Sequence, residues 1–465
     1  MTMPADPFAL LRTRKYVALL VLAALLGVPI SAAAYYFLWL VDRLQPWAYT
    51  SLPETLGFHG EPAWWPLLPL FVAGVLVALT IRFLPGTGGH SPVDGFKSGG
   101  TPTPAELPGI LVAALVSIGL GAVIGPEAPL IALGGGLAAL VVWIARRDSP
   151  AQTVAVVGAA GSFAAISALL GSPIIGAFLL MEAAGLGGPM LILVLLPGLL
   201  AAGLGFLIFV GLDSLTGLGT FSLAIPQLPP FAHPDAAELG WAIVIGLATA
   251  ILGNGIGWLG RLLRAHIERR MLVLTPIAGL AVAGLAIAYA EGTGKSSSDV
   301  LFSGQAALPK LIHDAGAYSV GALVLLLVCK SLAYGASLAG FRGGPIFPAM
   351  FIGAAGGIAL SHAPGLPLVP AVAMGIGGMS AARLRLPLTS VLLATMLLAS
   401  DSLAVMPLVI VAVVVSFVVS TWFTPTPNPP PQPVPQATAS PGADPGTPLP
   451  GSPSTPPAGS PLATP

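Results

Sequence analysis

Two short stretches rich in glycine and proline, GPEAP at residues 125–129 and GPIFP at residues 344–348, each stand at the start of an apolar segment. They lie 219 residues apart, and two further apolar segments begin at Pro173 and Pro387, which lie 214 residues apart. Similar spacing of two separate features indicates an internal duplication. Proline suits the first turn of a helix, and glycine allows a close approach of the backbone. We therefore predict helices that are interrupted at equivalent places in two related halves.

The composition predicts a protein of the lipid bilayer. Hydrophobic residues make up 55% of the 465 residues, charged residues only 8%, and the mean hydropathy is +0.91. Soluble domains carry about 25% charged residues, so this chain cannot cover a water-facing surface. The apolar runs are long and continuous and do not alternate at every second residue, which favours helices over a β-barrel. We expect an all-α polytopic membrane protein.

Several classes of function are disfavoured by the sequence. Eighteen basic residues balance eighteen acidic ones, so we expect no nucleic-acid partner. Cys329 is the single cysteine, and the six histidines are scattered, so neither a disulfide nor a metal centre is expected. An enzyme acting on lipid would need a nucleophile or a metal cluster, and no GxSxG motif occurs. The sequence GTGKS at residues 292–296 resembles the end of a P-loop, but it follows an apolar helix, and we expect no nucleotide and no other cofactor.

The chain divides into two membrane repeats, which we place at residues 17–211 and 238–423. Basic residues precede the first apolar run, which predicts a cytoplasmic N-terminal segment over residues 1–16. The linker at residues 212–237 contains no Lys or Arg, so we expect it to be extracellular. The first helix of the second repeat ends with a basic cluster, whereas the first repeat begins with one. The two repeats therefore have inverted topology, as in many transporters.

The last part of the chain, residues 424–465, has a different composition. It holds 16 prolines and a single charged residue, Asp444, so it cannot bury a core. We expect a disordered tail, with a docking role as the alternative. Together with the N-terminal segment, this predicts a multi-pass protein of the cell membrane with both termini in the cytoplasm.

Interrupted helices indicate a pathway for a polar solute. Such helices occur in membranes where protein or a wet cavity satisfies the freed backbone groups. A helix start presents free N–H groups and about half a positive charge. Several converging starts would hold a small anion without a Lys or Arg side chain. A tight packing turn is the alternative for any one motif, but three motifs, including GTGGH at residues 86–90, together favour anion handling.

These motifs resemble those of the CLC family of chloride channels and proton/chloride antiporters. The family signatures GSGIP, GREGP and GxFxP resemble residues 86–90, 125–129 and 344–348, and the PLT that opens a late helix resembles the segment starting at Pro387. Lys330 stands where many members have a basic residue. The resemblance covers about residues 17–421. It implies two inverted repeats of tilted and broken helices, and a homodimer with one pore per subunit.

The resemblance implies that Glu127 is the gating glutamate, whose carboxylate occupies an anion site and leaves it on protonation. The residues give an independent reason. A carboxylate in the first turn of a helix is favoured by the helix dipole, but its charge is costly within a membrane, so the two effects compete. A group in that balance responds to pH, voltage or a competing anion. A static helix cap is the alternative interpretation.

The same resemblance implies the residues that bind the anion. Thr87, followed by Gly88, matches the family's serine, whose hydroxyl donates to chloride, and Ser91 is the fallback. Backbone N–H groups of the third motif complete the site. Since proline stands at position 345 and has no N–H group, Ile346 and Phe347 have to provide them.

Two departures from the family pattern bear on proton coupling. The family's antiporters have two successive glutamates at 182 and 183, of which the second accepts the proton on the inner side, and this chain has Glu182 followed by Ala183. Glu182 could replace it in a proton pathway with Glu127, although a structural role is favoured. The family's chloride-binding tyrosine is also missing, since Asp401 and Ser402 stand at that place. We therefore predict transport of chloride or a similar small anion that is channel-like or loosely coupled to protons, with proton/chloride antiport and fluoride export as alternatives.

Overall fold

The computed structural model describes residues 11–95, 100–185, 188–216, 231, 233–397 and 402–423. The predicted tail, the first ten residues, most of the predicted linker and Asp401 lie outside these ranges. The described part is helical and contains no strand, only one isolated β-bridge. Seven of its helical segments are long and apolar enough to cross a membrane. The prediction of an all-α polytopic membrane protein is confirmed.

The first repeat is formed by helices between residues 14 and 216. They are α2 (Arg14–Pro46), η1 (Trp47–Ser51), α3 (Leu52–Thr55), α4 (Leu67–Phe83), η2 (Pro85–Gly88), η3 (Pro92–Asp94), α5 (Leu107–Gly119), α6 (Glu127–Ala145), α7 (Ala151–Leu170), α8 (Pro173–Ala183) and α9 (Gly188–Thr216).

The second repeat is formed by helices between residues 236 and 422. They are α10 (Ala236–Ile267), η4 (Glu268–Arg270), α11 (Met271–Thr293), η5 (Ser297–Asp299), α12 (Ala307–His313), η6 (Ala315–Ala317), α13 (Val320–Gly340), α14 (Ile346–Leu360), α15 (Leu368–Leu384), α16 (Pro387–Leu397) and α17 (Ser402–Trp422).

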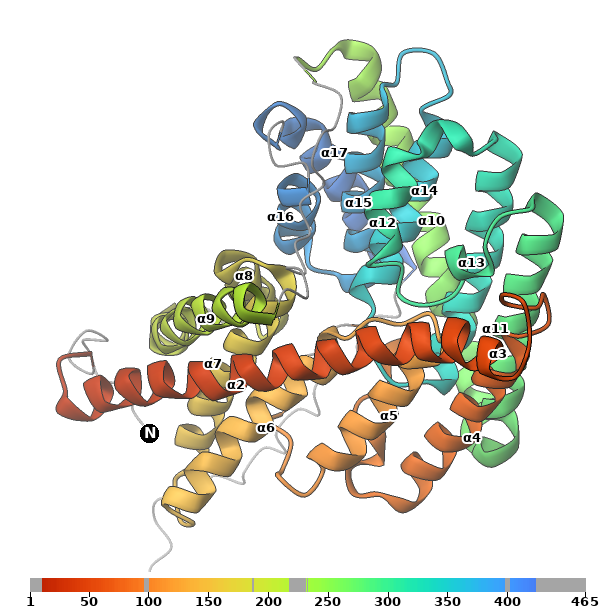
Figure 1. The fold of residues 1–465 in the computed structure, drawn as a ribbon. Coiled ribbons are helices and arrows are strands. Elements are labelled where there is room, and N and C mark those ends of the chain that lie inside the picture. Colours follow the sequence, from red (N-terminus) through yellow and green to blue (C-terminus); the bar gives the residue numbers. More distant parts are fainter. Residues whose placement is uncertain are drawn as a thin grey trace, which may run out of the picture. The chain divides into compact units, whose positions relative to one another are not determined.

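The same pattern of helix packing occurs in both repeats, which lie side by side in Figure 1. Helix α6 packs on α7 as α14 packs on α15, and α2 packs on α9 as α10 packs on α17. Helix α7 contacts α8 and α9 as α15 contacts α16 and α17. Across the boundary, α4 contacts its counterpart α11, and α8 contacts its counterpart α16. The fold therefore consists of two inverted-topology repeats, as predicted.

Glycines allow a close helix crossing at equivalent places in the two repeats. A Cβ atom on Gly134 of α6 would lie 2.3 Å from the carbonyl oxygen of Gly161 on α7. A Cβ atom on Gly353 of α14 would lie 2.3 Å from the carbonyl oxygen of Gly375 on α15. The first members of these pairs are 219 residues apart and the second members 214, the spacings already found in the motifs. Since helices in lipid associate mainly by close packing, these small residues hold each interrupted helix against its neighbour.

Large apolar side chains cover the outer surfaces of several long helices. Leu25 on α2, Ile251 on α10 and Val273 on α11 are 66%, 63% and 58% exposed. Such exposure would be costly in water and is expected of residues that face hydrocarbon. The exposed apolar positions therefore agree with the membrane spans assigned by length.

The glycine crossing of the second repeat gives a stability prediction. Gly353→Ala places a methyl group against the backbone of α15, and such overpacking costs about 1–3 kcal/mol of the free energy of unfolding. We expect a lower thermal denaturation midpoint of the purified protein in detergent. Gly356→Ala is the matched control, because a Cβ atom there meets only Leu327, at 3.8 Å. Equal midpoints for the two variants would contradict this account of the crossing.

Candidate anion site

The starts of two broken helices, one from each repeat, meet through their backbones. The N–H of Gly125 donates to the carbonyl of Gly344 (2.8 Å), and the N–H of Gly344 donates to the carbonyl of Gly125 (2.6 Å). Each glycine is followed by a proline, after which α6 and α14 begin. Proline is tolerated there because the first residues of a helix have no partner for their N–H groups. The positive ends of two helices are thereby brought to one place in the protein.

Glu127, the first residue of α6, directs its carboxylate to the start of α14. Its Oε1 accepts a hydrogen bond from the N–H of Phe347 at 2.8 Å, and the side chain is fully buried. The Oε2 atom has no hydrogen-bond partner in the described part of the chain. A carboxylate is an anion, so its position marks a place where backbone N–H groups can bind negative charge. Ile346, the other residue expected to provide an N–H group, is also fully buried.

The carboxylate fits only because both bridging residues are glycines. A Cβ atom on Gly344 would lie 1.6 Å from Glu127 Oε2, and one on Gly125 would lie 2.4 Å from the same oxygen. Neither distance is possible between unbonded heavy atoms, so any larger residue would displace the carboxylate. The glycines of the second and third motifs therefore have two functions, the backbone pairing and the space for the acid.

A tyrosine that the sequence analysis did not identify supports the same turn. The hydroxyl of Tyr334 on α13 donates to the carbonyl of Pro345 at 2.8 Å, and the residue is completely buried. Tyr334 lies one helical turn after Lys330 on the same face of α13. The spacing of four residues from Lys330 is the only feature of the sequence that indicated Tyr334.

The first motif forms a left-handed turn at the wall of a large cavity. Residues 86–89 all have positive φ angles, including Thr87 at 48°, which is unusual for a residue other than glycine. Thr87 and the buried Gly88 border a cavity of about 860 Å³ together with Ser91, whose buried hydroxyl has no hydrogen-bond partner in the described part of the chain. Pro345 and the first turn of α6 border the same cavity. The three motifs are thus brought together, but through different contacts.

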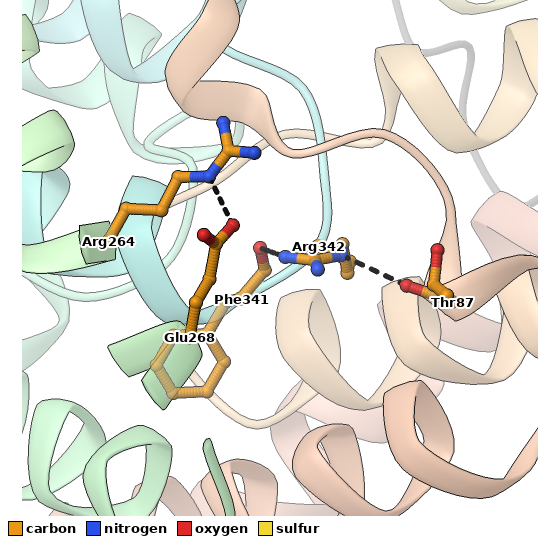
Figure 2. Close-up of polar contacts among 5 residues, drawn as sticks. All are labelled: Thr87, Arg264, Glu268, Phe341 and Arg342. Carbon is orange, nitrogen blue, oxygen red and sulfur yellow. Dashed lines mark hydrogen bonds and ion pairs between the residues drawn. The ribbon is translucent and has the colours of Figure 1, made fainter. Parts of the chain in front are cut away.

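Thr87 makes a backbone contact with the turn before α14. Its side chain is exposed, and its carbonyl oxygen accepts a hydrogen bond from Nε of Arg342 at 3.4 Å (Figure 2). Arg342 lies in the turn between α13 and α14 and borders the cavity. A guanidinium therefore stands on the cavity wall in addition to the helix starts, and the sequence analysis did not identify it. The sequence shows Arg342 next to the third motif, but nothing in it shows the distant partner.

Lys330, by contrast, does not face the cavity. Its Nζ donates to the carbonyls of Asp299, Val300 and Leu301 at 2.8, 3.1 and 3.1 Å. The ammonium also lies 4.2 Å from the ring centroid of Phe351. A buried lysine needs this number of acceptors to offset its desolvation. Lys330, which lies on α13, therefore holds the loop that precedes α12 in contact with α13.

Glu182 lies at the end of α8, where it binds the start of α16. Its carboxylate accepts hydrogen bonds from the N–H of Leu388 (3.0 Å), the N–H of Thr389 (2.8 Å) and the hydroxyl of Thr389 (2.7 Å). This is a helix cap supplied by the opposite repeat. Ala183 follows it at the end of the same helix. The structure does not bring Glu182 into contact with Glu127, and the contacts favour its structural role.

The described residues include the P-loop-like stretch and possible metal ligands. No group of three or more such ligands occurs among them. In the P-loop-like stretch, Nζ of Lys295 donates to the carbonyl of Ala317 and lies 4.5 Å from the ring centroid of Tyr318. Ser402 begins α17, so the place of the family's tyrosine is only partly described.

Comparison with known proteins identifies the family. Residues 93–421 match the family described as voltage-gated chloride channels. YfeO of Escherichia fergusonii, whose naming as an ion-transport protein is itself provisional, is 30% identical over 79% of this chain and 85% of its own. YfeO of Escherichia coli O1:K1 is equally similar. The chain therefore belongs to the CLC family and is a membrane protein of the anion-transport class.

Solved structures show the same fold. A slow cyanobacterial Cl−/H+ antiporter matches with a TM-score of 0.70 and 19% identity, over 88% of this chain and 95% of that one. A CLC-type fluoride/proton antiporter matches with a TM-score of 0.67 and 20% identity, over 88% of this chain and 96% of that one. At these identities the comparisons establish the architecture of tilted and broken helices.

The cap formed by Glu182 can be tested separately from proton transfer. Glu182→Ala removes an acceptor that binds three donors of α16 and should cost about 0.5–2 kcal/mol of the free energy of unfolding. We expect a lower denaturation midpoint in detergent and unchanged proton flux in liposomes. Glu182→Gln, which keeps one acceptor oxygen, should be closer to the wild type in stability. Loss of proton flux in Glu182→Gln at full stability would instead assign the residue to a proton pathway.

Proposed function

We propose that this protein moves chloride or a similar small anion across the membrane, with Glu127 as the gate. The observation that carries the proposal is the hydrogen bond from the N–H of Phe347 to the Glu127 carboxylate. It supports an anion site at the start of α14, because the group now bound there carries the charge that a halide would carry. The site joins both repeats, as expected for a pathway through a transporter of this architecture.

Gating follows from competition for one backbone donor. While Glu127 is charged, its carboxylate holds the N–H of Phe347 and excludes an anion. Protonation removes the negative charge, weakens the hydrogen bond and ends the attraction to the helix start. An incoming anion can then take the donors of Ile346 and Phe347. Thr87 and Gly88 form the part of the pathway on the cavity side.

Proton coupling is expected to be weak. Ala183 stands at the position of the family's inner proton acceptor, and Glu182 holds the start of α16 with its carboxylate. A carboxylate committed to three donors is a poor proton carrier, because protonation would break the cap. We therefore favour channel-like or loosely coupled transport over strict proton/chloride antiport.

We also propose the arrangement in the cell that the family implies. The protein forms a homodimer with one pathway per subunit, and both termini lie on the cytoplasmic side. The membrane repeats at residues 17–211 and 238–423 are joined by an extracellular linker at residues 212–237. Residues 1–16 and the proline-rich residues 424–465 lie in the cytoplasm.

Replacing Glu127 tests the gate directly. Glu127→Gln has no charge to compete with an anion, so we expect faster chloride efflux from liposomes near neutral pH and loss of the acceleration that the wild type shows as the pH falls. Glu127→Ala should behave in the same way. Chloride efflux is measured at several pH values after reconstitution.

Glu238→Gln is the matched control for this experiment. Glu238 is also a buried acid in the first turn of a helix, where its carboxylate accepts from the N–H of Asp235 at 3.0 Å. Its replacement should leave the pH response intact. Unchanged flux and pH response in both Glu127 variants, with folded protein, would refute the gating role.

The choice of anion and the coupling are tested in the wild type. We expect chloride efflux to exceed fluoride efflux, and a chloride gradient to move few protons into liposomes. Efflux is followed with ion-selective electrodes, and proton movement with a pH-sensitive dye. Preferred fluoride efflux would favour the fluoride exporter, and stoichiometric proton movement would favour the antiporter.

A further inference from the structure

The cavity beside the three motifs contains an unusual charge. Among its described lining residues, His90, Glu106 and Arg342 are the only titratable ones, and Arg342 is the only permanent cation. Glu106 directs Oε2 to the N–H of Thr103 at 2.8 Å. Among the described lining residues, the guanidinium is therefore the main source of positive charge, in addition to the helix starts.

Arg342 is held in place by neutral groups. Its Nε donates to the Thr87 carbonyl (3.4 Å), its Nη1 to the Phe341 carbonyl (3.3 Å) and its backbone N–H to the Ser117 hydroxyl (3.2 Å). Figure 2 shows the guanidinium between the first two of these acceptors. Carbonyl dipoles orient the group without neutralising its charge, and Nη2 makes no hydrogen bond within the described residues.

No carboxylate of the described residues forms an ion pair with Arg342. The acid drawn beside it in Figure 2, Glu268, is paired with Arg264 one helical turn earlier. A half-buried arginine between helices of a membrane protein is costly, and such residues face a polar cavity or a ligand. The cost is offset if an anion accompanies the charge in the cavity.

The backbone around Arg342 is shaped to admit its side chain. Gly88 lies next to this side chain, since a Cβ atom there would lie 3.3 Å from Arg342 Cγ. Thr87 has a left-handed backbone conformation, and its carbonyl oxygen accepts the hydrogen bond from Arg342 Nε. Arg342, in the turn before the third motif, thus contacts Thr87 of the first motif. The two residues are 255 positions apart in the sequence.

We infer that Arg342 recruits small anions into the cavity and selects them against cations, ahead of the site that the Glu127 carboxylate occupies. A fixed cation in a cavity with low-dielectric walls raises the local anion concentration and repels cations. A guanidinium with one free nitrogen binds a halide weakly enough to release it to the helix starts. This inference rests on the proposed anion transport, and it assigns the charge selection to a side chain outside the family motifs.

The test uses the full-length protein in liposomes at low and high ionic strength. Arg342→Gln should reduce chloride efflux about tenfold at low ionic strength, within the range of electrostatic steering. The reduction should shrink in high salt, because screening removes the advantage of the charge. Arg342→Lys keeps the charge and should retain most of the efflux. Arg82→Gln, an exposed arginine at the end of α4 that does not border the cavity, is the control.

Three outcomes separate the explanations. Absence of chloride efflux in the wild type would refute the proposed function itself. Normal efflux in Arg342→Gln at every salt concentration would refute only the role of Arg342. Equal loss in the Gln and Lys variants, independent of salt and with a lowered denaturation midpoint, would show that Arg342 merely supports the turn.

A second approach leaves Arg342 and its contacts intact. Thr103→Cys places a thiol at an exposed position on the cavity wall, and methanethiosulfonate reagents then add a charge of either sign. The anionic reagent should lower chloride efflux and the cationic reagent should not. The wild-type protein, in which Cys329 is buried, is treated with the same reagents to show any effect that does not arise from modification of the introduced thiol. Equal effects of the two reagents would contradict selection by charge in the cavity.

Discussion

The reciprocal hydrogen bonds between Gly125 and Gly344 are the constraint on which the site depends. They bring the starts of α6 and α14 together from opposite repeats, so that a side chain from one helix reaches the free N–H groups of the other. The same two residues leave the space that the Glu127 carboxylate fills. Because a side chain at either position would occupy that space, backbone pairing and anion binding have the same requirement for glycine.

The two repeats share a scaffold but contribute different chemistry. The third residue of the repeated motif is Glu127 in the first half and Ile346 in the second, so one half provides an acid and the other provides backbone donors. A similar asymmetry exists between α8 and α16, where Glu182 of the first repeat caps the helix of the second. A duplicated backbone therefore has unlike residues in equivalent places, where the starts of its two broken helices meet.

Positive charge is used in two ways within this protein. Lys330 is surrounded by carbonyl oxygens and serves the structure, since its ammonium is fully engaged. Arg342 is held at Nε and Nη1 only, and it borders a cavity. Helix starts alone provide partial charges that bind and release an anion easily. A nearby guanidinium adds a full charge, whose field reaches further than that of a helix start.

The sequence by itself determined the class of the fold, because membrane helices follow from local composition and the repeats follow from spacing. It also singled out Glu127 and the N–H of Phe347, which the structure joins by a hydrogen bond, because both belong to the first turn of a helix. The partners of Arg342, Tyr334 and Glu182 could not be predicted in this way. The contacts of Arg342 and Glu182 join segments that are distant in the sequence. The contact of Tyr334 depends on the path of the backbone between α13 and α14. Only the tertiary structure decided that an arginine borders the cavity and that Glu182 caps α16.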